Sequence, residues 1–277
     1  MTEIRPLTSR FGAEVVGLNL RHMTEAQRDM LRAALARFGL LLFRDQALDD
    51  ADLYRFSCAM GDGRLEASAR SVSHAARLRE VAYLTNLKLE DGSPFGFGGN
   101  TTDYWHSDQE FREHPATLAT LYCLIPSPVG GGTSFASTRV GCLGLDEVML
   151  ARLRALWSTR RPAANHDNAR HVEVAHPVVS RNPLTGTESI YVSENAIRFL
   201  GVEAAEGAAL KSYLMARILC PENIYSHSWQ MGDLVIYDNT QLLHRREAFE
   251  GPRWLKATKI FPSALHFHVM SGRVEAA

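Results

Sequence analysis

The chain is expected to fold as one α+β domain, residues 1–277, built on a β-sandwich or barrel with flanking helices. Two observations predict this class: two helical segments lie near the N-terminus, and many short strand-like runs separated by turns follow them. No internal repeat, low-complexity tract or linker divides the sequence. At 277 residues the chain is long enough to bury a substantial core.

The first part of the chain carries the helical signals. We expect a strand within residues 11–20, a helix at 24–38, a buried strand at 40–45, a second helix at 49–60 and an irregular polar stretch at 62–80. Thr24 is a suitable N-cap, apolar residues then recur with the helical period, and Gly39 ends the pattern. The run LLLF is apolar at every position, which is typical of a strand buried on both faces.

Beyond residue 80 short strands predominate. The expected elements are strands at 81–87, 104–111, 116–126 and 254–262, a strand within 128–138, helices at 144–157 and 205–218, a charged loop at 158–175, a hairpin of AHPVVS and ESIYV, and the strand LVIYD after the turn MGD. Residues 90–103 form a long Gly-rich loop, expected to act either as a lid or as a simple connection.

The composition excludes several classes of protein. A net charge of −1 leaves no electrostatic signal for binding nucleic acid or an anionic membrane. No apolar run approaches the ~18 residues that a membrane span needs, and the N-terminus lacks the apolar region of a signal peptide. The four cysteines are far apart in the sequence, so reduced thiols are expected rather than a zinc ribbon. We therefore expect a cytoplasmic protein with no nucleic-acid or membrane partner.

One short segment, WHSDQEF, holds a candidate metal site. On a strand, residues two apart face the same way, so His106 and Asp108 would point together into one cavity. A third ligand has to come from elsewhere, and His244, just beyond the predicted strand LVIYD, is the best candidate. Two imidazoles and one carboxylate leave coordination positions open, an arrangement that suits non-haem Fe(II) oxygen chemistry. The His-x-Asp pattern alone is common by chance, so other residues must decide.

From end to end the chain resembles the TauD/TfdA family of Fe(II)- and 2-oxoglutarate-dependent dioxygenases. Five segments in the family's order carry the resemblance: FGAEVVGLNL with LLLFRDQAL; WHSDQEF; PATLATLYCLIPSPVGGGTSFAS; HPVVSRNPLTGTESIYVSENAIRFLGV; and WQMGDLVIYDNTQLLHRREAF with PRWLKATKI. Each segment alone is a weak signal, but together they are specific and cover nearly the whole chain. The resemblance implies a double-stranded β-helix core, also called a jelly roll, with flanking helices.

The resemblance also implies a set of functional residues. His106, Asp108 and His244 correspond to the iron ligands, and Thr133 and Arg253 to the residues that bind the distal carboxylate of 2-oxoglutarate. A guanidinium can bind a carboxylate through two hydrogen bonds, and a nearby hydroxyl can complete the contact. The implied reaction consumes O2 and 2-oxoglutarate, releases succinate and CO2, and hydroxylates or desaturates a small organic substrate.

Two departures from the family bear on the substrate. Many relatives carry a second arginine four residues after the first, and here that position is Ala257. In the taurine enzyme this arginine meets the anionic group of the substrate, so taurine or another sulfonate is not expected here. The distance in sequence from His244 to Arg253 is also short, which leaves Lys256 as an alternative 2-oxoglutarate anchor.

Halogenating relatives replace the carboxylate ligand by a small residue, so Asp108 argues against halogenation.

Three functions remain open at this level. The first is oxidation of an amino acid or natural-product intermediate, because the residues around His244 resemble tailoring members of the family. The second is degradation of an alkyl sulfate, sulfonate or aryloxy acid, and the third is a non-redox metal-binding protein on the same fold. Asn86 and Tyr104 are candidate substrate contacts, and Asp238–Asn239 is expected to shape the turn that aims His244.

Overall fold

A seven-stranded sheet forms the framework of the molecule. The computed structural model describes residues 2–62, 64–67, 78–101, 103–161 and 172–275. The strand order is β1-β2-β3-β13-β5-β16-β4, with only β2 and β3 parallel among the described pairs of this sheet. The strands are β1 (Glu3–Pro6), β2 (Ala13–Val16), β3 (Leu40–Phe43), β4 (Ala82–Thr85), β5 (Leu118–Ile125), β13 (Leu234–Asp238) and β16 (Trp254–Ile260).

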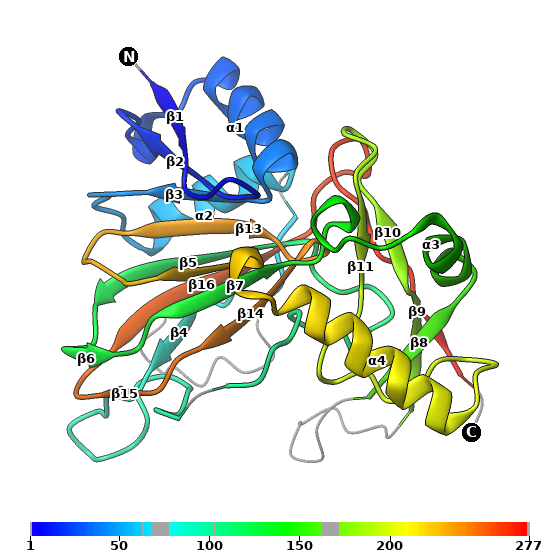
Figure 1. The fold of residues 1–277 in the computed structure, drawn as a ribbon. Coiled ribbons are helices and arrows are strands. Elements are labelled where there is room, and N and C mark those ends of the chain that lie inside the picture. Colours follow the sequence, from blue (N-terminus) through cyan, green and yellow to red (C-terminus); the bar gives the residue numbers. More distant parts are fainter. Residues whose placement is uncertain (1, 63, 68–77, 102, 162–171, 276–277) are drawn as a thin grey trace.

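A second, three-stranded sheet packs against the inner face of the first (Figure 1). It has the order β12-β7-β14 and is antiparallel throughout, with β12 (Ile224–His227), β7 (Thr133–Ser137) and β14 (Leu242–Arg246). Phe135 of β7 and Leu242 of β14 share one buried cluster with Val235 and Tyr237 of β13. The two sheets therefore enclose a common core, which is the sandwich expected from the sequence.

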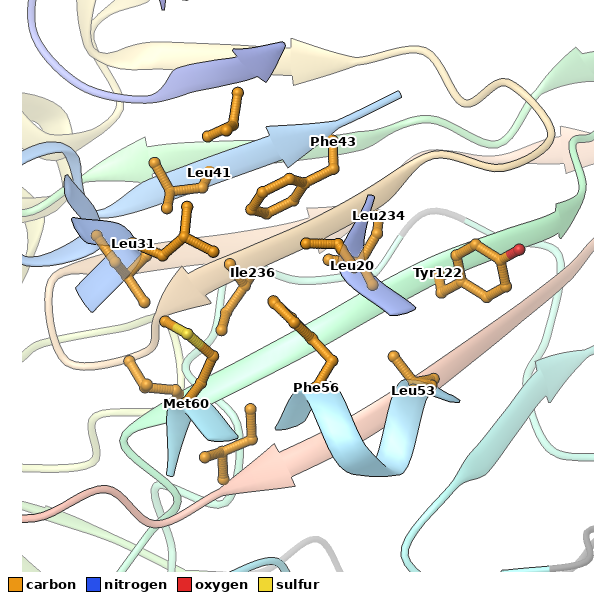
Figure 2. Close-up of a cluster of buried hydrophobic side chains, with 14 of the residues drawn as sticks. Leu20, Leu31, Leu41, Phe43, Leu53, Phe56, Met60, Tyr122, Leu234 and Ile236 are labelled. Carbon is orange, nitrogen blue, oxygen red and sulfur yellow. The ribbon is translucent and has the colours of Figure 1, made fainter. Parts of the chain in front are cut away.

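Helices α1 (Glu25–Phe38) and α2 (Asp50–Met60) cover the outer face of the large sheet. Figure 2 shows side chains from both helices meeting Leu41 and Phe43 of β3 and Ile236 of β13. Leu40 and Leu42 of β3 face the inner core instead, so the apolar run LLLF is buried on both sides. Both helices begin at a capping box, which accounts for their accurate prediction.

A second group of elements lies beside the sandwich (Figure 1). It contains α3 (Glu147–Arg154), α4 (Ala204–Ile218), β8 (Trp157–Arg160), β9 (Val174–Pro177), β10 (Val179–Arg181), β11 (Glu188–Ile190) and β17 (Arg273–Val274). Their apolar side chains form a separate buried cluster, which Trp105 and Leu243 connect to the sandwich. The remaining short elements are β6 (Val129–Gly130), β15 (Phe249–Glu250) and the 3-10 turns η1 (Leu20–His22), η2 (Val140–Cys142) and η3 (Pro221–Asn223).

Three expectations from the sequence need correction. Residues 104–111 do not form a strand, because His106 makes an isolated bridge and a turn with Gln109 at φ +59° follows. The helix expected at 144–157 ends at Arg154, and Trp157–Arg160 form strand β8 rather than the start of a loop. Five strands were not expected at all: β1, β12, β14, β15 and β17. Parts of the stretches 62–80 and 158–175 lie outside the described residues, and the single-domain organisation stays a prediction.

Candidate metal centre

His106 and His244 are brought together by their backbones. The amide of His106 donates to the carbonyl of His244 at 3.1 Å, and the amide of His244 donates back to the carbonyl of His106 at 2.9 Å. Residues paired in this way project to the same face, and the two imidazole centroids are 4.3 Å apart. The segment before Asp108 therefore pairs with strand β14 at one point. His106 and His244 meet through this bridge, whereas the sequence had suggested that His106 and Asp108 share one strand.

Asp108 joins them from the turn that follows. The side chain of Asn239 holds this turn: its Oδ1 accepts from the amide of Asp108 at 2.8 Å, and its Nδ2 donates to the carbonyl of Asp108 at 2.9 Å. Ser107 adds a hydrogen bond from its hydroxyl to the carbonyl of Asn239 at 2.7 Å. One ligand atom from each of His106, Asp108 and His244 lies within 4.8 Å of the others. Asn239 therefore aims Asp108, whereas the sequence had suggested that it aims His244.

The carboxylate of Asp108 is held through one of its two oxygens. Tyr237 donates its hydroxyl to Oδ2 at 2.9 Å, and Lys259 donates its ammonium to the same oxygen. Burial alone would raise the pKa of Asp108, but the charge and the hydrogen bond of Lys259 oppose it, and the pKa lies below its ordinary value. Asp108 is therefore an anion, and among the described residues its Oδ1 accepts no hydrogen bond.

Both imidazoles are in forms that can bind a metal ion. Nδ1 of His106 lies 2.8 Å from the carbonyl of Tyr104, which can only accept, so Nδ1 carries the proton and Nε2 keeps its lone pair. Burial, with His106 and Lys259 nearby, lowers the pKa of His244 to about 3, so this ring is neutral. Two imidazoles and one carboxylate within a few ångströms fit a divalent transition-metal ion.

Thr133 lies one side-chain row away from His244 on the inner face of the smaller sheet. His244 pairs with Phe135 across the β7–β14 ladder, and Thr133 precedes Phe135 by two residues, which is about 7 Å along a strand. The hydroxyl of Thr133 accepts from the indole of Trp229 at 3.0 Å. Its own proton therefore remains available for an acceptor such as a carboxylate.

Arg253 enters the core just before β16. It is 5% exposed, and among the described residues its guanidinium makes one hydrogen bond, from Nε to the carbonyl of Gly131 at 3.0 Å, and no ion pair. Burial, together with the charge of Arg246, lowers the pKa of Arg253 to about 10, so it is still charged at neutral pH. A buried guanidinium with no acidic partner in the described structure is suited to binding an anionic ligand.

Lys256 and Ala257 lie on opposite faces of β16. Lys256 points to the outer face, where its ammonium is 2.6 Å from Asp50 of helix α2. Ala257 belongs to the inner cluster. Lys259, two residues further along the same inner face, reaches Asp108. The inner face of β16 therefore carries a cation, Lys259, two residues after Ala257, which occupies the position where many relatives have their second arginine.

The two candidate substrate contacts are placed differently from each other. Asn86 is exposed, and its amide donates to the carbonyl of Gly251 at 2.9 Å and accepts from the amide of Arg253 at 3.0 Å. It thus holds the backbone that carries Arg253. Tyr104 is 49% exposed, and its ring lies 4.9 Å from the ring of His106. Substrate contact stays a prediction for both.

Tyr237 and Lys259 are the contacts that sequence reasoning missed. Tyr237 lies in the strand LVIYD, where alternation puts it on the same inner face as Val235. That alternation could have marked it as a core residue, but its hydrogen bond to Asp108 depends on how β13 meets a turn from a distant segment. Lys259 follows Ala257 by two residues on β16, and its contact with Asp108 likewise depends on which distant segments meet.

The fold and the site together define a class of protein: a sandwich of two sheets whose inner face carries two histidines and one aspartate arranged for a metal ion. The model of the "Taurine catabolism dioxygenase TauD, TfdA family" matches residues 3–258. The chain belongs to this family. The jelly-roll core and the enzyme class expected from the sequence, an α-ketoglutarate-dependent dioxygenase and thus an oxidoreductase, are confirmed at this level.

Individual relatives extend this result. The chain is 29% identical over 260 residues to a (S)-phenoxypropionate/alpha-ketoglutarate-dioxygenase of Sphingobium herbicidovorans, covering 88% of each chain. It is 28% identical over 194 residues to pentalenolactone F synthase of Streptomyces arenae, covering 62% of this chain and 64% of that one. A crystal structure of AAD-2 in complex with Mn(II) and N-oxalylglycine matches with a TM-score of 0.78 at 25% identity, covering 95% of this chain and 98% of that chain.

The fold is also shared with a taurine dioxygenase from Burkholderia xenovorans, with a TM-score of 0.81 at 21% identity, covering 100% of this chain and 97% of that chain. Within the described ranges, no helix is both long and apolar enough to cross a membrane.

Proposed function

We propose that the chain is an Fe(II)- and 2-oxoglutarate-dependent dioxygenase that hydroxylates or desaturates a small organic acid. His106, Asp108 and His244 would hold the iron. The observation that carries the proposal is the position of this triad on the same inner face as Thr133, near the buried Arg253, which has no acidic partner in the described part of the chain. A protein that bound metal for a purely structural or non-redox purpose would have no use for that second, anion-binding part of the cavity.

Arg253 and Thr133 would bind the distal carboxylate of 2-oxoglutarate. The separation of about 7 Å between the rows of His244 and Thr133 is suited to a five-carbon diacid that reaches the metal with its other end. Lys256 is the weaker candidate because its ammonium is already paired with Asp50 on the other face of the sheet. Arg253 is therefore the anchor that we propose.

The protein's own residues would prepare the site for the reaction. When bound, ferrous iron and 2-oxoglutarate supply the oxidising power for attack on a substrate C–H bond, with O2 consumed and succinate and CO2 released. Asn239 fixes the backbone of Asp108, Tyr237 orients its carboxylate, and the carbonyl of Tyr104 fixes the tautomer of His106. These contacts reduce the rearrangement needed when the metal binds.

The relatives support an organic acid as the substrate. The phenoxypropionate enzyme is named for such an acid and matches over 88% of this chain, whereas the match to the natural-product enzyme covers 62%. An aryloxy or similar acid is therefore our first candidate, and an acidic amino-acid or natural-product intermediate is the second. The four cysteines are free, which supports the cytoplasmic location that we propose.

Two measurements test the proposal. Anaerobic addition of Fe(II) and 2-oxoglutarate should produce a visible charge-transfer band, and Asp108→Ala should lose it. Succinate release should then be stimulated by one or more members of a panel of aryloxy acids, alkyl sulfates and N-acyl amino acids. A protein that binds the metal, gives no band and releases no succinate with any compound would belong to the non-redox class instead.

A further inference from the structure

Arg246 is a second guanidinium on the inner face of the smaller sheet. It follows His244 by two residues on β14 and pairs directly with Thr133 of β7. Residues directly opposite in an antiparallel pair project to the same face, so Arg246 shares a face with both His244 and Thr133. It therefore stands in the row beyond the metal ligand, beside the proposed binding point for the distal carboxylate of 2-oxoglutarate.

Arg246 has no acidic partner among the described residues. Its Nη2 donates to the carbonyl of Thr101 at 2.9 Å, and its Nε is buried without an acceptor in the described structure. The Gly-rich loop passes close above it: a Cβ at Gly98 would lie 3.8 Å from Nη1, and one at Gly99 would lie 4.0 Å from Nη2. The guanidinium thus lies between the metal row and the loop, with hydrogen-bonding capacity unused.

Each of the other cationic side chains at the site has an anion assigned to it, and Arg246 has none. Lys259 is already paired with Asp108. Arg253 is proposed to bind 2-oxoglutarate. Burial lowers its pKa and the charge of Arg246 lowers it further, so the two guanidinium groups lie near enough to repel each other. A divalent ion would add two further positive charges, and 2-oxoglutarate supplies two negative ones. The loaded site would therefore be positively charged overall, which favours an anionic substrate.

We propose that Arg246 binds the carboxylate of the substrate and thereby determines the preference of this enzyme for acids. The inference rests on the proposed function and adds to it the residue that recognises the acid group. Ala257 cannot perform this task from the position where family members carry an arginine. Arg246 supplies the guanidinium from the facing sheet, with a fork geometry that suits two hydrogen bonds to one carboxylate.

The neighbouring Arg245 provides a matched control. It points to the other face of β14, where its guanidinium lies 4.8 Å from the ring centroid of Trp105 and 3.1 Å from Glu247. Both residues are arginines on strand β14, but only Arg246 faces the candidate metal site. Substituting each by glutamine removes one positive charge in both cases, so a general charge effect is separated from a local contact.

The experiment measures binding rather than turnover. The full chain is loaded with Mn(II) and 2-oxoglutarate without oxygen, then titrated calorimetrically with phenoxyacetate and its neutral counterpart phenoxyacetamide, and with N-acetylphenylalanine and its amide. We expect the wild type to prefer an acid to its amide, and Arg246→Gln to weaken acid binding by about 10- to 100-fold while leaving amide binding unchanged. Arg245→Gln should keep the full preference, and Arg246→Lys should keep part of it.

Three outcomes would overturn the inference. These are no preference for acids in the wild type, an acid preference that survives in Arg246→Gln, or a loss of 2-oxoglutarate affinity in Arg246→Gln that matches the loss in Arg253→Gln. If the melting temperature shows that Arg246→Gln does not fold, the comparison of Arg246→Lys with Arg245→Lys decides. Failure of the proposed function is seen separately, as absence of succinate release, because acid binding through Arg246 does not require turnover.

Discussion

On the outer face of β16, Lys256 is paired with Asp50, and Thr258 shares hydroxyl hydrogen bonds with Ser57 at 2.8 Å and Thr120 at 2.6 Å. On the inner face of the same segment, Arg253 has no acidic partner among the described residues, and Lys259 is bound to a candidate metal ligand. These contacts pair Lys256 and Thr258 of the outer face with polar groups of the protein itself. On the inner face, the two cations lie toward the candidate metal site and the proposed 2-oxoglutarate site.

This difference separates stability from function along one strand. A buried polar group that is fully satisfied contributes to the packing of the fold, whereas an unsatisfied one costs folding free energy until a ligand binds. Substitutions on the outer face should therefore change the free energy of unfolding and leave ligand binding intact. Substitutions on the inner face should change ligand binding and leave the free energy of unfolding nearly unchanged.

The largest effect is expected for Asp50→Asn on the outer face. The substitution leaves the buried ammonium of Lys256 without its counter-charge, so the free energy of unfolding should fall by about 3–5 kcal/mol. Chemical denaturation measures this change, and affinity for 2-oxoglutarate should stay within twofold of the wild type. The double variant Asp50→Asn/Lys256→Met is the control, because it removes the unpaired charge and should recover much of the loss. A large change in 2-oxoglutarate affinity without loss of stability would contradict the assignment of faces.

Next in size is Arg253→Gln on the inner face. Losing the charge-assisted contacts to the distal carboxylate should weaken 2-oxoglutarate binding by about 10- to 100-fold. The melting temperature should not fall, since no ion pair of Arg253 is present among the described residues. Titration of the charge-transfer band with 2-oxoglutarate gives the affinity. Lys256→Gln serves as the comparison, and an equal loss of affinity in that variant would identify Lys256 as the anchor instead.

Lys259→Met should change metal affinity in the opposite direction. The ammonium of Lys259 would compete with a metal ion for the carboxylate of Asp108, and a nearby unit charge repels a dication by several kcal/mol at an effective dielectric of about 20. Solvent and salt reduce this value, so we expect Mn(II) to bind about tenfold more tightly to the variant. Calorimetry measures the affinity. Weaker binding would mean that the orientation of Asp108 by Lys259 outweighs its charge.

Tyr237→Phe should have the smallest effect. It removes one hydrogen bond to Asp108 and keeps the ring that packs against Phe135, so Mn(II) affinity should fall by about two- to tenfold. Combined with Lys259→Met, it distinguishes the two contacts to the same oxygen, because one variant is expected to tighten metal binding and the other to weaken it. Weaker metal binding in both variants would show that both residues act mainly by orienting Asp108, and tighter binding in both would contradict an orienting role for Tyr237.

The sequence predicted those elements whose signals are local. Helices α1 and α2 begin at capping boxes within one residue of the expected positions, and the run LLLF was recognised as doubly buried. His106, Asp108 and His244 were singled out because the resemblance to the TauD/TfdA family added the motifs that the His-x-Asp pattern lacks, and the structure brings the three side chains together, while their role as ligands stays a prediction. The order of strands in the large sheet was not predictable, since β3 and β13 pair across most of the sequence.

The prediction of a strand at 104–111 shows what local reasoning lacks. The segment was expected to be one of the short strands beyond residue 80, but the side chain of Asn239 forms hydrogen bonds with the backbone amide and carbonyl of Asp108 and holds the segment in a turn. Such a contact depends on the end of β13 lying beside this segment. The contacts of Tyr237, Lys259 and Arg246 were out of reach for the same reason, because each depends on which strand faces which.

The bridge between His106 and His244 has a consequence for folding. The two residues come from opposite halves of the chain, so closing the loop between them costs entropy that their own two hydrogen bonds scarcely recover. An ion held by both imidazoles would act as a reversible crosslink at that junction. Metal supply would then affect how long the folded protein survives in the cell as well as how fast it works.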